Sequence, residues 1–249
     1  RLKTFADNQF YGRFLELPAD VVGYNRYFGW YKEAGSADNF GEWLDLYHNE
    51  KEKRPVCLSE YGGGGAISQH KDNVDWESDI DPVGVRHYEN YQSQLHEILW
   101  KQFSVRKYLW AEFIWCMFDF ASYGRTEGDT KSQNDKGLCT RERIPKDVYF
   151  FYRSVWSSEK TVYITERRHE FRTCDVPFVK VYSNADAVEL CINDVSHGRI
   201  SRCELPDDEN TVFVWKNIKI KPGTKNKICA KAYFSDGTSR TDYTFWTGK

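Results

Sequence analysis

The chain of 249 residues lacks an excess of either charge and lacks any long apolar run. Its 35 basic and 37 acidic residues leave a net charge of −2, which gives nucleic acid or an anionic membrane little to attract. A membrane-spanning helix needs about 18 or more consecutive apolar residues, and no stretch reaches that length. We therefore expect neither a nucleic-acid partner nor a membrane partner.

The cysteines are odd in number and scattered singly along the chain. The seven cysteines form no CxxC pair and no Cys/His cluster with the spacing of a zinc site. Cys57, Cys116, Cys191 and Cys229 lie in apolar runs and are interpreted as small core residues, so we expect reduced thiols, no structural metal and no cofactor. The opening residues, RLKTF, are typical of neither a signal peptide nor a helix start. We interpret them as a cut end, which leaves the compartment undetermined.

Aromatic residues, in contrast, are abundant at 16% of the chain. They favour two interpretations equally. One is a core built on large rings, and the other is a carbohydrate site, because the flat faces of sugars stack on aromatic planes.

Residues 1 to about 160 alternate apolar runs with amphipathic helical patterns, as repeated β/α units do. The predicted strands are residues 21–30, 55–62 and 111–120. Helices are predicted through Phe40–Tyr47, over 86–103, and from Pro145, because proline suits the first turn of a helix. Apolar strands separated by helices indicate a parallel sheet covered on both faces.

The pattern changes in the remaining part, residues 161–249. Short runs with period-two alternation are separated by the turn signals Asn193-Asp194, Pro222-Gly223 and Asp236-Gly237. This spacing predicts a second domain, a small antiparallel β-sandwich. The chain is thus predicted to be α/β plus all-β, with domains 1–160 and 161–249.

Each of the three predicted parallel strands ends in polar or aromatic residues, in the segments 25–30, 59–62 and 115–120. In parallel β/α folds, functional residues gather at the carboxyl ends of the strands. A single glutamate before a Gly-rich loop, such as Glu60, is more often a surface or capping residue. Three such ends together favour a site.

Four ordered segments then resemble glycoside hydrolase family 2, which contains β-galactosidases, β-glucuronidases and β-mannosidases. They are GYNRYFGWY, PVCLSEYG, WCMFDFASYGRTEGD and NDKGLCTRERIPKDVYFFYRSVW, within residues 20–156. The resemblance implies the C-terminal part of a (β/α)8 TIM barrel. The segment VKVYSNADAVELCIND is similar to the sandwich domain that follows the barrel in many bacterial members, so we expect an immunoglobulin-like β-sandwich.

The resemblance implies that Glu60 is the catalytic nucleophile, in a Ser-Glu-Tyr-Gly context at the end of the seventh barrel strand. Such a carboxylate forms a glycosyl-enzyme intermediate and needs a partner acid about 5–5.5 Å away. The four glycines after it, Gly62–Gly65, are expected to turn tightly and leave room for the sugar. Four in a row exceeds the family pattern, so we also expect a mobile loop.

Five further residues match family positions, and all of them except Asn25 also have a plainer interpretation. Tyr27 would hydrogen-bond the nucleophile, or be a core tyrosine. Asn25 would lie beside it at the mouth of the site. Trp115 would form the floor under the sugar, or fill the core. Asn134 and Lys136 would reach the substituent at C5 of the sugar, or form a β-turn with a solvated lysine.

Two candidates, one residue and one pair, are set aside. His70 is interpreted as a surface histidine, with the pocket rim as the alternative. The pair Asn49-Glu50 resembles the family's acid/base motif, but it ends an amphipathic helix between the sixth and seventh strands, and its order along the chain is wrong. We therefore expect the acid/base residue to lie outside this chain, which carries three of eight β/α units, and we expect the isolated chain to be inactive.

These features predict a retaining exo-β-glycosidase whose partner is a carbohydrate substrate, with the oligomeric state open and a homo-oligomer included. A β-galactosidase is favoured over a β-glucuronidase, because Asp135, Asp129 and Glu127 lie near Lys136 and would repel an anionic sugar. The alternative from another class is a non-catalytic carbohydrate-binding or scaffold fragment. That class has no need of a carboxylate held by a tyrosine.

Overall fold

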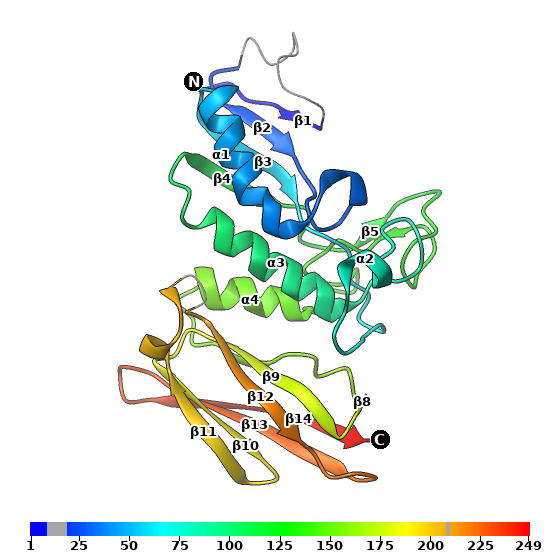
Figure 1. Ribbon diagram of the computed structural model, residues 1–249, viewed down its shortest axis with the longest axis vertical. Coiled ribbons are helices and arrows are strands. Elements are labelled where there is room, and N and C mark those ends of the chain that lie inside the picture. Colours follow the sequence, from blue (N-terminus) through cyan, green and yellow to red (C-terminus); the bar gives the residue numbers. More distant parts are fainter. Residues whose placement is uncertain (9–18, 208–209) are drawn as a thin grey trace. The chain divides into compact units, whose positions relative to one another are not determined.

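A computed structural model describes residues 1–8, 19–207 and 210–249 (Figure 1). The chain forms two compact units. The first comprises residues 1–66, 75–87 and 94–144, and the second comprises residues 67–74, 88–93 and 145–249. Within the described ranges, no helix combines the length and the apolar character needed to cross a membrane.

The first unit is built on a four-stranded parallel sheet with the order β1-β2-β3-β4. The strands are Ala6–Asp7, Val22–Asn25, Val56–Tyr61 and Leu109–Ile114. The sequence predicted three of them. It missed β1, which has only two residues and is therefore too short to show a periodic pattern.

All three predicted strands extend beyond the observed strand ends, two of them by five or six residues. β2 ends at Asn25 rather than at residue 30, and β4 ends at Ile114 rather than at residue 120. The run from 111 to 120 is also not continuously buried, since Phe113 and Met117 are about half exposed. Aromatic side chains beyond the strand ends extended the apolar pattern without extending the hydrogen-bond ladder.

The predicted helices are confirmed, with two shifted starts, since α3 begins three residues later than predicted and α4 two residues later. They are α1 (Phe40–Glu50), α3 (Glu89–Phe103) and α4 (Asp147–Trp156). Pro145 was expected in the first turn of α4, but Lys146 is the N-cap residue and the helix begins at Asp147, so that expectation was wrong. The remaining short elements of the first unit and of its loops are η2 (Lys32–Ala34), η3 (Ala37–Asn39), α2 (Trp76–Asp79), β5 (Phe120–Ala121) and β6 (Gln133–Asn134).

Aromatic pairs fix α1 and α3 against the sheet. The Tyr24 and Tyr47 rings meet edge to face at 5.1 Å, and their hydroxyls are 2.5 Å apart. Tyr61 meets Phe103 of α3 at 5.0 Å in the same manner. Because successive strand residues point to opposite faces, the neighbours Asn25 and Glu60 are directed away from these helices.

The glycine run after β3 is packed tightly rather than mobile. Residues 61–66 are all buried. A Cβ on Gly63 would lie 2.7 Å from the Trp30 ring and 2.8 Å from Leu95, and a Cβ on Gly62, where φ is +126°, would lie 2.8 Å from His96. These glycines therefore let neighbouring side chains close onto the backbone. The expectations of a mobile loop and of space left for the sugar were wrong.

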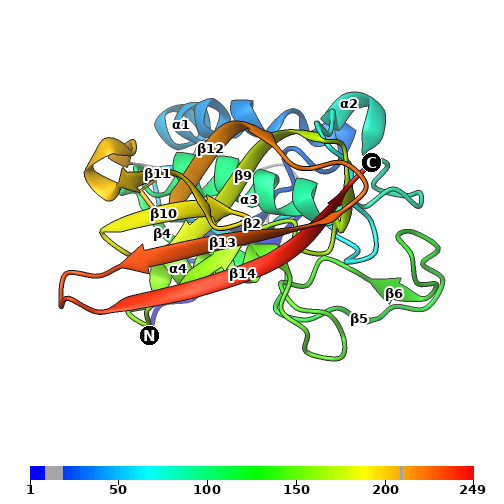
Figure 2. The same ribbon diagram turned by 90° about the horizontal axis from the view of Figure 1, so that it is seen from below.

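The second unit contains two sheets in addition to α4. One has the order β11-β10-β13-β14-β8 and the other has the order β12-β9-β7. Figure 2 shows β10, β13 and β14 lying side by side. The strands are β7 (Val162–Ile164), β8 (Phe171–Arg172), β9 (Asp175–Ser183), β10 (Ala187–Ile192), β11 (Val195–Ser201), β12 (Val212–Lys219), β13 (Lys225–Tyr233) and β14 (Ser239–Gly248), with the short helix η4 (Arg202–Glu204).

Apolar residues of both sheets share one core, which includes Val179, Leu190, Phe213, Ile228 and Trp246. All three predicted turns join consecutive strands. Asn193 and Asp194 both have positive φ, 51° and 65°, and link β10 to β11 as a two-residue hairpin. Gly223 and Gly237 also have positive φ, at 61° and 79°.

Of the cysteines expected in the core, Cys57 is buried, whereas Cys116, Cys191 and Cys229 are only half-buried. Cys191 and Cys229 pair across β10 and β13, and in β10 the strand residues on either side of Cys191 are buried. The period-two alternation therefore places these two thiols on the outer face of the sheet.

We predict that Gly63→Ala destabilises the full-length protein by about 1–3 kcal/mol, because the added methyl group overpacks the contact with Trp30 and Leu95. Urea unfolding would measure the loss. Gly124→Ala is the matched control, since no atom lies within 4 Å of its Cβ position and only the cost of φ +82° applies, about 1 kcal/mol. A Gly63→Ala protein as stable as the wild type would contradict the packing argument.

Candidate active site

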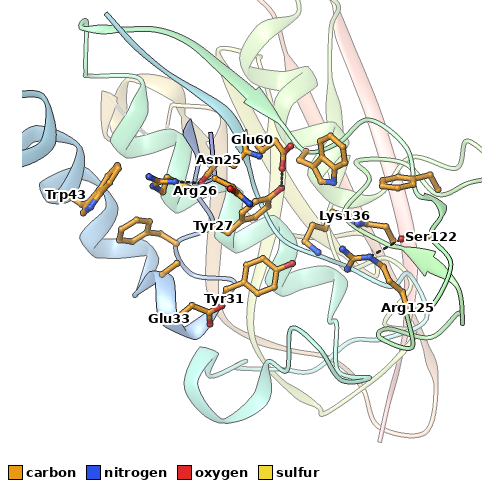
Figure 3. A pocket seen from close by; sticks show the side chains of 16 residues that line it. Asn25, Arg26, Tyr27, Tyr31, Glu33, Trp43, Glu60, Ser122, Arg125 and Lys136 are labelled. Atoms are coloured by element: carbon orange, nitrogen blue, oxygen red, sulfur yellow. Dashed lines mark hydrogen bonds between the residues drawn. The ribbon is translucent and has the colours of Figure 1, made fainter. Parts of the chain in front are cut away.

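The centre of the candidate site is a hydrogen bond between Tyr27 and Glu60 (Figure 3). Glu60 is the penultimate residue of β3, and Tyr27 lies two residues beyond the end of β2. The Tyr27 hydroxyl donates to Oε2 of Glu60 over 2.6 Å, and the Arg26 amide donates to the Glu60 carbonyl over 2.9 Å. The ends of two parallel strands thus bring together the two residues predicted to act together.

Burial, followed by the hydrogen bond to Glu60, raises the pKa of Tyr27 far above its usual range. Tyr27 therefore keeps its proton and acts as the donor in this bond. Within the described part of the chain, Oε1 of Glu60 accepts no hydrogen bond. One carboxylate oxygen is held by the tyrosine, and the other is available to a ligand.

Asn25 and Trp115 occupy the ends of the flanking strands. Asn25 is the last residue of β2, and its Oδ1 accepts a 2.8 Å hydrogen bond from the Ser59 hydroxyl, which leaves its amide nitrogen for other partners. Trp115 directly follows β4, is half-buried, and meets Phe120 edge to face at 5.8 Å. Both side chains line the same cavity as Glu60.

Asn134 and Lys136 also line this cavity, from the segment that begins at β6. Lys136 is only 2% exposed, so the interpretation as a solvated lysine was wrong. Its ammonium group lies 5.4 Å from the ring centres of both Trp30 and Tyr31. Oδ1 of Asn134 accepts a 3.0 Å hydrogen bond from the Lys136 amide and thereby closes a local turn.

The acidic residues near Lys136 are engaged elsewhere. Glu127 pairs with Arg125, and Asp135 lies 2.7 Å from Nδ1 of His87. Among the described residues, no carboxylate lies within ion-pair distance of the Lys136 ammonium group. The cavity therefore contains a buried cation that forms no ion pair with the residues that the structure describes.

All six predicted site residues line one cavity of about 880 Å³, together with residues that the sequence did not single out. In Figure 3, Trp43 and Arg26 lie on one side of the view, and Arg125, which donates a hydrogen bond to the Ser122 hydroxyl, lies on the other. Tyr31 and Arg125 lie inside the segments GYNRYFGWY and WCMFDFASYGRTEGD, so the family resemblance could have identified them as site residues. Asn8 follows strand β1, which the sequence pattern did not reveal. The additional lining residues are Asn8, Arg26, Phe28, Tyr31, Glu33, Ala34, Trp43, Phe120, Ser122 and Arg125.

Residues 7–161 match the sequence model of the glycosyl hydrolases family 2 TIM barrel domain, and residues 176–240 match a domain of unknown function, DUF4982. The first match covers more than half of the chain. The chain belongs to glycoside hydrolase family 2.

Relatives within glycoside hydrolase family 2 carry two activity names. A β-glucuronidase from Bacteroides fragilis is 35% identical over 84% of this chain and 29% of its own length. A β-galactosidase from Bacteroides ovatus is 25% identical over 55% of the chain and 16% of its length. The structure of an FMN-binding β-glucuronidase from Faecalibacterium prausnitzii L2-6 aligns with a TM-score of 0.84 and 32% identity, covering 100% of this chain and 36% of that one. The family 2 chain thus spans about three tenths of the length of the first curated relatives, 29% and 27%.

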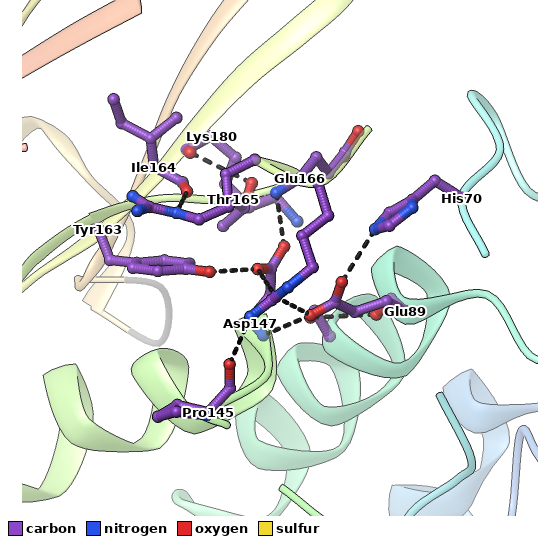
Figure 4. A network of polar contacts seen from close by, with 12 residues as sticks. His70, Glu89, Pro145, Asp147, Tyr163, Ile164, Thr165, Glu166 and Lys180 are labelled. Carbon is purple, nitrogen blue, oxygen red and sulfur yellow. Dashed lines mark hydrogen bonds and ion pairs between the residues drawn. The ribbon is translucent and has the colours of Figure 1, made fainter. Parts of the chain in front are cut away.

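The family 2 chain has a second polar cluster, in its second unit, and His70 belongs to it (Figure 4). The His70 side chain is 5% exposed and contacts Oε2 of Glu89 at 2.9 Å, so both earlier interpretations, surface and pocket rim, were wrong. Oε1 of Glu89 accepts from the Asp147 amide over 3.0 Å and from Arg168 over 2.6 Å. This cluster joins the first residues of α3 and α4.

Beside that cluster, Asp72, Glu166 and His169 are close enough to hold a metal ion. Arg172 already occupies the space between the acids, because its guanidinium group pairs with Asp72 and lies 2.9 Å from Glu166. Burial and the charge of Arg172 lower the pKa of His169 to about 4. A buried cation of the protein neutralises this group, so these residues fit a metal poorly.

Asp147 is fully buried, and burial, together with the charge of Glu89, raises its pKa to about 7. In the unfolded chain an aspartate has a pKa of about 3.9. Between these values the folded state binds more protons than the unfolded state, so stability falls as the pH rises through this window. We predict that the melting temperature of Asp147→Asn, relative to that of wild type, rises as the pH increases from about 4 to 8. Thermal unfolding of the full-length protein would measure this, and a difference independent of pH would contradict the raised pKa.

Proposed function

We propose that this chain carries the nucleophile and part of the sugar-binding site of a retaining exo-β-glycosidase, and that the preferred sugar is a β-glucuronide. The observation that supports this best is the buried Lys136 ammonium group in the cavity that also contains Glu60, since no carboxylate of the described residues lies within ion-pair distance of it. A cation held in this way is suited to a carboxylate on the ligand.

In the proposed reaction, Oε1 of Glu60 attacks the anomeric carbon while the glycosidic oxygen leaves with a proton from an acid residue. The anomeric carbon then carries an ester bond to Glu60, and water cleaves this bond in the second step. The Tyr27 hydroxyl holds Oε2 and keeps the carboxylate aimed at the sugar. We propose that the acid comes from outside this chain, because the relatives are about three times as long and Glu50 is an exposed helix end.

The sugar-binding residues follow from the same geometry. Oδ1 of Asn134 already accepts a hydrogen bond from the backbone amide of Lys136. Nδ2 of Asn134 is therefore the group that would donate to a sugar carboxylate, beside the ammonium group of Lys136. Trp115 offers an aromatic face for the apolar side of the ring, and the Asn25 amide would bind a hydroxyl. Together these contacts would orient the anomeric carbon toward Glu60.

A β-galactosidase is the second candidate. It was favoured on the sequence because three acids near Lys136 would repel an anionic sugar. Two of those acids, Asp135 and Glu127, are paired with His87 and Arg125, which weakens that reason. The similarity to the Bacteroides ovatus protein, which is named a β-galactosidase, supports this second candidate. A non-catalytic carbohydrate-binding role is disfavoured, since binding alone does not require a tyrosine bonded to a carboxylate.

We also propose a domain division near residue 160, with an immunoglobulin-like domain after it. The family 2 match that ends at residue 161 and the two antiparallel sheets around a common core support this division. Helix α4 precedes the boundary in sequence, although it belongs to the compact unit that contains the sheets.

We predict that Glu60→Gln in the full-length enzyme lowers kcat by at least about 1,000-fold while the melting temperature stays close to that of wild type, because the variant is isosteric but lacks the nucleophile. Steady-state kinetics on a chromogenic β-glucuronide would measure the loss. Glu50→Gln is the matched control and should leave kcat unchanged within about twofold, because Glu50 is exposed at the end of α1. A Glu60→Gln enzyme that keeps a tenth of the wild-type rate would rule out this nucleophile.

We predict that wild-type enzyme has a higher kcat/KM on a β-glucuronide than on the β-galactoside with the same leaving group. Lys136→Ala should lower the glucuronide value by about 30-fold or more, consistent with a buried charge-assisted contact of about 2–3 kcal/mol, and should affect the galactoside less. Preference for the galactoside in wild type would favour the second candidate and leave the role of Glu60 intact.

A further inference from the structure

Behind the cavity, His87 and Asp135 form a buried pair whose side chains do not line the cavity wall. Their side chains are 0% and 5% exposed, and Nδ1 of His87 lies 2.7 Å from Oδ2 of Asp135. Nε2 of the same ring lies 3.1 Å from the carbonyl oxygen of Asp81. The imidazole therefore joins the loop that precedes α3 to the segment that carries the proposed sugar-binding residues.

Two glycines allow the chain to close around this pair. A Cβ on Gly64 would collide with Oδ1 of Asp135 and lie 2.9 Å from Nδ1 of His87, and a Cβ on Gly128 would lie 2.5 Å from Oδ2 of Asp135. The Trp30 ring meets the imidazole edge to face at 4.7 Å. These close approaches leave the two side chains little room for another arrangement.

Asp135 lies between Asn134 and Lys136 in the sequence, so its orientation controls theirs. The Gly65 amide donates to the Asp135 carbonyl over 3.1 Å, and the Cys116 amide donates to the Lys136 carbonyl over 3.1 Å. The backbone of this turn is thus fixed on both sides. The contact between His87 and Asp135 fixes it through a side chain as well.

Proton counting shows what the imidazole adds. A carbonyl oxygen and an ionised carboxylate can only accept hydrogen bonds, so both ring nitrogens of His87 must donate if Asp135 is ionised. The pair then has no net charge. Without the imidazole, the buried Asp135 carboxylate would lose the cation that lies 2.7 Å from its Oδ2, one residue from the buried ammonium group of Lys136. It would compete with a ligand for Lys136.

We propose that His87 and Asp135 form a positioning pair that holds the Asn134–Lys136 turn and keeps the Lys136 ammonium group available to the carboxylate of the substrate. This inference rests on the proposed glucuronide specificity. Neither residue touches the sugar. The pair determines how well the ground-state complex forms, so its loss raises KM more than it lowers kcat.

The test compares His87→Leu with the double variant His87→Leu/Asp135→Asn in the full-length enzyme. For His87→Leu we expect KM for a chromogenic β-glucuronide to rise roughly 10–100-fold, the range that a displaced binding group produces, with kcat within about threefold of wild type. The double variant removes the competing charge and should regain at least about threefold of the loss in KM. His48→Leu, on α1, is the control and should change neither constant.

Three results would contradict the proposed positioning role. They are an unchanged KM in His87→Leu, a loss confined to kcat in that variant, and a KM of the double variant that is no lower than that of His87→Leu. If His87→Leu does not yield folded enzyme, His87→Gln keeps one donor for Asp135 and should raise KM by roughly 3–10-fold, with the same rescue by Asp135→Asn. A wild-type enzyme that does not prefer the glucuronide refutes the proposed function. A wild-type enzyme that prefers it, but whose KM is insensitive to His87, refutes the positioning pair alone.

Discussion

The candidate site depends on the register of the parallel strands β2 and β3, in which Asn25 pairs with Glu60. The register shifts between Tyr24 and Asn25, where the ladder has an irregularity, so the last residue of β2 comes level with the carboxylate. In a strand, a slip by one residue would turn Glu60 toward the helices and Tyr61 toward the cavity. The Tyr24–Tyr47 and Tyr61–Phe103 ring contacts oppose such a slip.

Behind this edge, close packing replaces the loop freedom that four consecutive glycines suggest. Trp30 contacts the Cβ position of Gly63 on one side and the imidazole of His87 on another, and the Lys136 ammonium group lies 5.4 Å from its ring centre. One buried indole thus connects the turn after β3 with the lysine of the proposed sugar site. The glycines matter for the site because they let side chains approach the backbone, and not because they let it move.

The sequence predicted those parts of the structure that have a regular apolar pattern, a characteristic turn sequence or a family motif. Long periodic helices such as α1, the turn at Asn193-Asp194, and six residues that line one cavity were predicted. Strands that lack a clear apolar pattern were missed, among them β1 with two residues, β11, whose first five residues are exposed, and β14, which begins with three exposed residues. The burial of Lys136 was missed because QNDKG is also an ordinary turn sequence, and only the tertiary fold places Trp30 and Tyr31 next to its ammonium group.

The two units treat buried charge in opposite ways, and this contrast indicates where a ligand belongs. In the second unit, Glu89 accepts from Arg168, from the Asp147 amide and from His70, so its acceptor sites are occupied by the protein itself. A carboxylate paired in this way stabilises a junction and has nothing left to offer a substrate. Lys136 lies buried beside aromatic rings, with no carboxylate of the described chain in reach. Desolvating a cation without an internal counter-ion costs stability, and that cost is recovered only when a bound anion completes the pair, which is why function is assigned to this cluster and structure to the other.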